Sequence, residues 1–149
     1  MAIKGIFHVN VNCSDLDRSQ PFYENLGFEV VHAIPEGGAP GMLRGLGLPP
    51  DSRARAAIMM LDRRNARGAR LDLIEWKKPP THGSPPSDLA HVGAVRIALW
   101  TKDIDAEYER LRADGIAFVS EPVAMAGARF CCFRDPDGTM LELIDFDSA

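Results

Sequence analysis

Hydrophobic and polar residues alternate in two short stretches that lie 88 residues apart in the chain. The first stretch covers residues 7–11 and leads into Asp15-Leu16-Asp17. The second covers residues 95–99 and leads into Asp103-Ile104-Asp105. A period of two is typical of a strand that buries one face. We therefore predict two equivalent strands in a duplicated chain.

Each predicted strand is followed by a segment with helical spacing and then by a glycine. In the second copy, Ile104, Tyr108 and Leu111 recur at i, i+4 and i+7, which predicts an apolar stripe along a helix from Asp105 to Asp114, and Gly115 follows. In the first copy, Asp17 is the expected N-cap and Gly27 the expected end. An acidic cap and a terminal glycine are typical helix boundaries, so the pattern predicts one amphipathic helix in each half.

Six further runs have the composition of strands, and they lie at residues 28–33, 56–61, 70–76, 117–120, 129–134 and 139–146. Each half then has the order β-α-β-β-β, which predicts an α+β fold of two tandem βαβββ modules. We expect a single domain with module 1 at residues 5–78, a proline-rich linker at 79–90 and module 2 at 91–147.

The two halves differ in length. Leu71-Asp72-Leu73 matches Leu141-Glu142-Leu143, but at an offset of only 70 residues, so the first half holds 18 extra residues. The stretch 35–55 is rich in glycine and proline and is where we place them. A long loop of this kind predicts a lid over a binding site.

Alternation along the strands also predicts which polar side chains share a face. The residues expected on the face away from the helices, at equivalent places in the two modules, are His8, Asp72, Arg96 and Glu142. If that face is curved, these four side chains converge. The further residues that we expect to line it are Asn10, Asn12, Trp100, Met60 and Phe133.

Three stretches carry a resemblance to a known family. They are His8 in the strand before Asp15-Leu16-Asp17, the run Phe22-Tyr23-Glu24-Asn25-Leu26-Gly27-Phe28, and Phe133-Arg134-Asp135-Pro136-Asp137-Gly138 ahead of Leu141-Glu142-Leu143. With them the chain resembles the vicinal oxygen chelate (VOC) superfamily, which includes glyoxalase I, methylmalonyl-CoA epimerase, extradiol dioxygenases, fosfomycin resistance enzymes and bleomycin-binding proteins. The resemblance implies two modules that form a half-open curved barrel, a homodimer, and a divalent metal on the concave face.

In that family the metal ligands are a His in the first strand and a Glu in the last strand of each module. The matching positions here are His8, Asp72, Arg96 and Glu142. Asp72 keeps an oxygen ligand on a side chain shorter by one methylene. Arg96 cannot be a ligand, because a guanidinium stays protonated and has no lone pair to give.

Two readings of the site remain open. His8, Asp72 and Glu142 can hold a divalent metal, with Fe, Mn, Zn or Ni as candidates. Alternatively, Arg96 between the two carboxylates replaces the metal with a charge-balanced network.

These readings imply different functions. With a metal, the resemblance implies a lyase, isomerase or dioxygenase acting on a small oxygen-rich or acidic substrate, with Glu142, Asp72 and Arg96 as catalytic residues. Without a metal, it implies a binding or sequestration protein, similar to bleomycin-binding proteins, in which Arg96 anchors an anionic ligand. A structural or regulatory subunit is a third alternative.

Composition and charge favour small molecules as the partners of this chain. The chain has 149 residues, with 17 basic and 21 acidic side chains and a net charge of −4, which argues against nucleic acid. No apolar run reaches a membrane-spanning length, and the first residues lack the pattern of a secretory signal, so we expect no membrane partner and a cytoplasmic protein. Three cysteines without metal or redox spacing predict reduced thiols.

Overall fold

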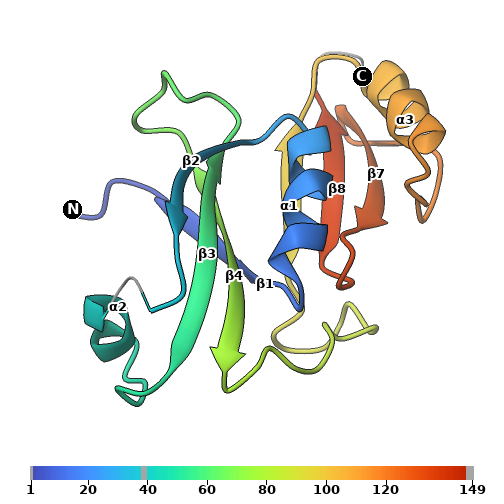
Figure 1. The fold of residues 1–149 in the computed structure, drawn as a ribbon. Coiled ribbons are helices and arrows are strands. Elements are labelled where there is room, and N and C mark those ends of the chain that lie inside the picture. Colours follow the sequence, from blue (N-terminus) through green and yellow to red (C-terminus); the bar gives the residue numbers. More distant parts are fainter. Residues whose placement is uncertain (1, 38–39, 147–149) are drawn as a thin grey trace. The chain divides into compact units, whose positions relative to one another are not determined.

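The computed structural model describes residues 2–37 and 40–146. The chain divides into two compact units, residues 1–83 and 84–149 (Figure 1). The boundary lies within the proline-rich stretch at 79–90. Each unit holds a four-stranded sheet and one helix of ten residues.

The first unit contains four strands and two helices. Their bounds are β1 (His8–Asn12), α1 (Leu16–Asn25), β2 (Glu29–Ile34), α2 (Pro40–Gly45), β3 (Arg53–Met60) and β4 (Arg70–Lys78). The strand order is β1-β4-β3-β2, with β1 parallel to β4 and the other pairs antiparallel. Helix α1 packs against β3 and β4.

The second unit repeats this topology. Its elements are β5 (Arg96–Trp100), α3 (Ile104–Ala113), β6 (Val123–Met125), β7 (Ala128–Arg134) and β8 (Met140–Asp145). The strand order is β5-β8-β7-β6, with β5 parallel to β8, and α3 contacts β8. The two βαβββ modules of the predicted α+β fold are confirmed.

Equivalent strands share the same register, which places equivalent side chains at equivalent depth. Asn10 of β1 pairs with Asp72 of β4, and Ala98 of β5 pairs with Glu142 of β8. Their neighbours on β4 and β8, Leu71, Leu73, Leu141 and Leu143, are buried. Burial of each such leucine contributes about 1.5–3 kcal/mol, so the leucine pattern fixes which face the carboxylates occupy.

Both long helices begin at an aspartate cap. The Asp103 side chain accepts a hydrogen bond from the Ala106 N–H (3.0 Å) and starts α3. In the first unit the cap is Asp15, whose Oδ1 accepts from the Asp17 N–H (3.0 Å). The expectation that Asp17 is the cap is therefore wrong, because Asp15 already has the extended backbone of a cap and Asp17 has helical geometry.

Two carboxylates at the strand ends complete these helix starts. Glu75 Oε2 accepts from the Leu16 N–H (3.1 Å), and Asp145 Oδ2 accepts from the Ile104 N–H (3.4 Å). Both carboxylates are buried. They satisfy N–H groups that have no partner within their helices, and negative charge is stabilised at that end of a helix.

Two other expectations need correction. Residues 117–120 do not form a strand, and only Phe118 makes an isolated bridge, to Phe133. The second strand of that module is instead β6, which pairs with β7 across a tight turn. The stretch 35–55 is not a single loop, since it contains α2 and the start of β3, and its residues 38 and 39 lie outside the described part.

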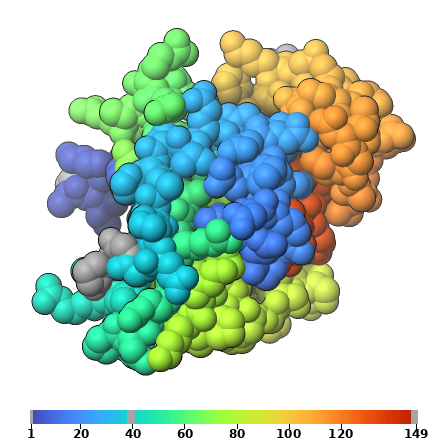
Figure 2. Space-filling view, in the orientation of Figure 1, coloured from blue at the N-terminus to red at the C-terminus, as the bar shows by residue number. Residues whose placement is uncertain are grey.

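The surface of the first unit includes the segment around α2, coloured teal in Figure 2. Leu43 in this helix is nevertheless buried. Of the described helices, none has both the length and the apolar character needed to cross a membrane.

Candidate functional site

In the first unit, strand β1 presents polar side chains on the face opposite α1. His8, Asn10 and Asn12 are exposed, whereas Val11 between them is buried. Asp72 lies on the neighbouring strand β4 and pairs with Asn10. The predicted alternation therefore brings His8 and Asp72 to the same side of one sheet.

His8 and Asp72 form the polar centre of this face. His8 Nδ1 lies 3.4 Å from Asp72 Oδ2, with the imidazole 44% and the carboxylate 13% exposed. The second oxygen of Asp72, Oδ1, is buried without a hydrogen-bond partner. Burial raises the pKa of Asp72, and the nearby charges of His8 and Arg70 offset only part of that effect. Asp72 is thus a desolvated carboxylate with an unused acceptor.

Arg70 belongs to the same face and was not among the predicted site residues. It lies two positions before Asp72 on β4, so both side chains share a side of the sheet. The guanidinium carbon stacks 4.5 Å from the centroid of the Phe7 ring, and Nε is buried without a partner. The same alternation that singles out Asp72 also points to Arg70.

In the second unit, Arg96 contacts Glu142 directly. Arg96 Nε lies 2.8 Å from Glu142 Oε2, and the side chains are 50% and 7% exposed, respectively. Cys132 on β7 pairs with Glu142, and its Sγ lies 3.9 Å from the same oxygen. Burial raises the pKa of the Cys132 thiol, and the Glu142 charge adds to this, so the thiol stays protonated. Arg96 on β5, Glu142 on β8 and Cys132 on β7 thus form one cluster, held by the ion pair and the thiol contact.

The donor chemistry of this cluster does not fit the metal site that the resemblance implies. The Glu142 oxygen that a metal would need is instead ion-paired with a permanently charged guanidinium. In residues 2–37 and 40–146, no three His, Cys, Asp or Glu side chains gather closely enough to hold an ion. The convergence of all four predicted ligand positions into one site stays a prediction.

Four of the five residues predicted to line the face differ in exposure and contacts. Asn10 and Trp100 are exposed, and Trp100 has the Lys102 ammonium 5.9 Å from its ring centroid. Met60 is buried on the face of β3 that it shares with Ile58, which pairs with Asp72. The carboxamide of Asn12 accepts a hydrogen bond from a tryptophan indole, described below.

The prediction that Phe133 lines the site is wrong. In β7 it pairs with Leu141 and therefore faces α3, away from Glu142. It is fully buried, with its ring 5.0 Å from Phe118. The neighbouring Cys132 takes the position on the Glu142 side, because the strand is shifted by one residue from the assumed phase.

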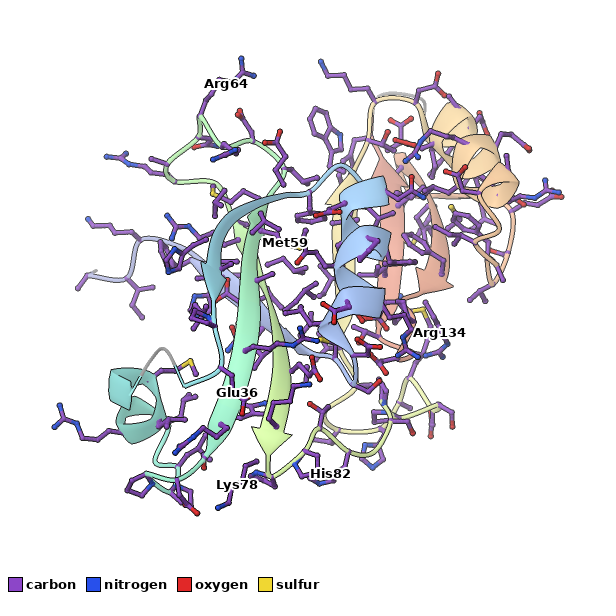
Figure 3. All side chains as sticks on the ribbon, in the orientation of Figure 1. Glu36, Met59, Arg64, Lys78, His82 and Arg134 are labelled. Atoms are coloured by element: carbon purple, nitrogen blue, oxygen red, sulfur yellow. The ribbon has the colours of Figure 1, made fainter. Side chains whose placement is uncertain are left out.

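A pocket of about 230 Å³ lies in the first unit where β4 ends. Its walls are Asn12, Leu48, Trp76, Pro79, Pro80, Thr81 and His82. Figure 3 shows His82 near the end of β4, below the strand. Of these residues, only Asn12 was predicted to line a site. The proline pair directly after the amphipathic strand that carries Trp76 is the signal that could have found the others.

Known proteins with similar sequence cover almost the entire chain. The model of the Glyoxalase/Bleomycin resistance protein/Dioxygenase superfamily matches residues 5–143. The protein YwkD of Bacillus subtilis (strain 168) is 26% identical over 149 residues, covering 97% of this chain and 99% of YwkD.

Solved structures agree with the fold. A glyoxalase family protein from Bacillus cereus superposes with a TM-score of 0.80 at 23% identity, covering 97% of both chains. TnmS3, an antibiotic binding protein from Streptomyces sp. CB03234, superposes with a TM-score of 0.66 at 26% identity and 96% coverage of both chains. With the duplicated βαβββ topology and the match over residues 5–143, the chain belongs to the Glyoxalase/Bleomycin resistance protein/Dioxygenase superfamily.

Proposed function

We propose that this chain binds a small acidic organic molecule without a metal, and that Arg96 anchors the ligand's carboxylate or phosphate. The contact between Arg96 Nε and Glu142 Oε2 carries this proposal. It puts a cation at the position where the family resemblance calls for a ligand histidine. A cation there weakens a metal site by charge repulsion and favours an anion.

The geometry of Arg96 suits this role. Only Nε contacts Glu142, and within residues 84–146 we find no partner for Nη1 or Nη2. A guanidinium can offer two parallel N–H groups to a carboxylate or phosphate. The nearly buried Glu142 holds one edge of the guanidinium, and the side chain remains half exposed. The other edge is therefore available to a ligand and already oriented.

The similarity to TnmS3 supports a binding role for this chain. TnmS3 is described as an antibiotic binding protein, and its fold and 26% identity span most of this chain. A binding site for a small organic molecule is thus compatible with this architecture.

Titration with malonate and inorganic phosphate, followed by NMR of the Arg96 Nε–H group and of the Ala98 and Cys132 backbone amides, tests the anchor. We expect saturable shifts in the wild-type protein that are lost in Arg96→Gln. The matched control is Arg44→Gln, an exposed arginine on α2, which should leave the shifts unchanged. Equal shifts in Arg96→Gln, or none for either anion at tens of millimolar, would contradict the anchor.

One observation favours a second candidate, a metal-dependent lyase, isomerase or dioxygenase. Asp72 Oδ1 is buried without a partner beside the half-exposed ring of His8, and both are ligand types for Fe, Mn, Zn or Ni. This function would require Glu142 to exchange Arg96 for the ion. Metal content therefore separates the two candidates.

A homodimer is part of the same proposal, because the resemblance implies one. Sedimentation velocity on the purified chain checks it. A species of twice the chain mass of 16.3 kDa is expected, and a monomer at micromolar concentration would contradict it.

A further inference from the structure

We infer that the pocket at the end of β4 is a subsite for a phenolic ring. This inference goes beyond the proposed function, since it adds a separate site for a second kind of small organic molecule. It uses residues in the first unit and none of the Arg96 cluster.

The shape suits one flat ring system. The volume of about 230 Å³ is below the range of about 300–1,000 Å³ typical of sites that enclose a drug-sized molecule. The wall is mostly apolar, with the Trp76 indole, the prolines Pro79 and Pro80, and Leu48. An aromatic ring can pack against an indole and proline rings with favourable dispersion and stacking. The pocket therefore fits one ring, or two fused rings, of a ligand.

Backbone and side-chain hydrogen bonds hold the wall in place. The Trp76 N–H donates to Thr81 Oγ1 (2.8 Å), and the Thr81 N–H donates to the Trp76 carbonyl (3.0 Å). These reciprocal bonds fasten the chain after β4 to the strand end. Because the site needs little ordering when a ligand enters, less of the binding free energy is lost.

Two polar groups in the wall have defined roles. Asn12 Oδ1 accepts from Trp76 Nε1 (3.0 Å), which orients the carboxamide and leaves its Nδ2 as a donor. His82 Nδ1 lies 3.1 Å from the Pro80 carbonyl oxygen. A carbonyl only accepts, so Nδ1 is the donor there, which leaves Nε2 as the ring nitrogen able to accept.

The Asn12 donor and the His82 acceptor together fit a hydroxyl group. A phenolic oxygen can accept from Asn12 and donate to His82, while its ring packs on Trp76. The pocket thus fits a phenol, in contrast to the anion proposed for Arg96.

Leu48 links the pocket to the extra residues of the first module. It lies between α2 and β3, in the stretch 35–55, where the second module has no counterpart. The insertion therefore supplies one wall of the subsite. This predicts that the pocket depends on Leu48 and that the second module lacks an equivalent.

The chain's two tryptophans make the test direct, because Trp100→Phe assigns the indole N–H signal of Trp76 in an NMR spectrum. The probes are p-cresol, 4-methylanisole, which can only accept, and p-xylene, which has no polar group. We expect p-cresol to shift the Trp76 signal saturably. It should bind about tenfold more tightly than p-xylene, as expected for one net hydrogen bond of about 1.4 kcal/mol.

Substitutions in and near the pocket test where p-cresol binds. Leu48→Ala and Asn12→Ala should weaken p-cresol binding at least several-fold, whereas Leu46→Ala and Asn10→Ala should not. Leu46 is exposed in the same insertion, and Asn10 is exposed on the same strand as Asn12, and neither lines the pocket.

Three results would overturn the subsite. They are no saturable Trp76 shift with p-cresol, equal affinity for p-xylene, or unchanged binding in Leu48→Ala. Failure of malonate would count against the Arg96 anchor, and failure of p-cresol against this pocket, so the two proposals fail separately.

Discussion

Arg96 and Glu142 form an ion pair across β5 and β8, with Arg96 Nε 2.8 Å from Glu142 Oε2. The carboxylate is 7% exposed and the guanidinium 50% exposed. A buried carboxylate needs a counterion or hydrogen-bond donors, and the Cys132 thiol at 3.9 Å is only a weak donor. Arg96 is therefore the main partner that keeps Glu142 stable on this face.

Removal of Arg96 should destabilise the second module. Arg96→Met keeps much of the apolar stem but leaves the Glu142 carboxylate without its cation. The free energy of unfolding should fall by about 1–2 kcal/mol, in the range for an unsatisfied buried group next to solvent. Urea unfolding at neutral pH measures it. The double variant Arg96→Met/Glu142→Gln should recover part of the loss, and an unchanged single variant would mean that the pair contributes nothing.

Glu75 should contribute stability that depends on pH. Burial acts to raise its pKa, but hydrogen bonds from Lys77, the Leu16 N–H and Arg55 together outweigh this, so the pKa is lowered. A lowered carboxyl pKa gives stability above the unfolded-state value near 4.5 that is lost as the pH falls through the folded-state value.

Glu75→Gln tests this contribution. The variant keeps the size of the side chain but cannot pair with Arg55 as a carboxylate. We expect a loss of about 1–3 kcal/mol in unfolding free energy at neutral pH and a smaller difference from wild type in acid. Urea midpoints measured from about pH 7 down to pH 3 give the comparison. A constant difference over that range would contradict the role of the charge.

Ionisation of Asp72 should lower the stability of the folded protein, whereas ionisation of Glu75 raises it. Burial raises its pKa, so the ionised form is disfavoured in the folded protein, and stability falls as the pH rises through the unfolded and then the folded pKa. Asp72→Asn mimics the neutral acid. We expect it to be as stable as wild type or more stable at neutral pH, whereas Glu75→Gln is less stable. Thermal unfolding of both at one pH measures the sign, and a clear loss for Asp72→Asn would contradict the interpretation.

The alternation of apolar residues predicted both sheets, both long helices and the face that holds His8 and Asp72. It did not locate the first helix start, because Asp15 and Asp17 are the same residue type two positions apart. Only the backbone distinguishes them, through the extended conformation of Asp15. Sequence spacing cannot supply that difference.

The hydrogen bonds of Glu75 and Asp145 could not be predicted from the sequence either. Their parity with buried leucines is evident in the sequence, and Glu75 is ion-paired with Arg55. Their hydrogen bonds to the N–H groups of Leu16 and Ile104 depend on where a helix begins in space. Such contacts join residues 59 and 41 positions apart, and no local pattern encodes them.

The cysteines should be unreactive in the folded chain. Burial raises the pKa of Cys131 to about 12, and the pKa of Cys132 is raised for the same main reason. The thiolate is the reactive form, so both should react slowly with a disulfide reagent near pH 8 and rapidly in urea. Cys13 is fully buried and should show the same slow reaction in the folded protein. Rapid modification of Cys132 in the native protein would contradict the protonated state assigned to it.

The most direct test of the account is the metal content of wild-type protein and Arg96→His, each purified without chelator and then incubated with Fe, Mn, Zn or Ni before gel filtration. If Arg96 occupies the place of a ligand, wild type should retain far less than one metal ion per chain, and Arg96→His should retain more. One ion per wild-type chain that is lost in His8→Ala would contradict the metal-independent site.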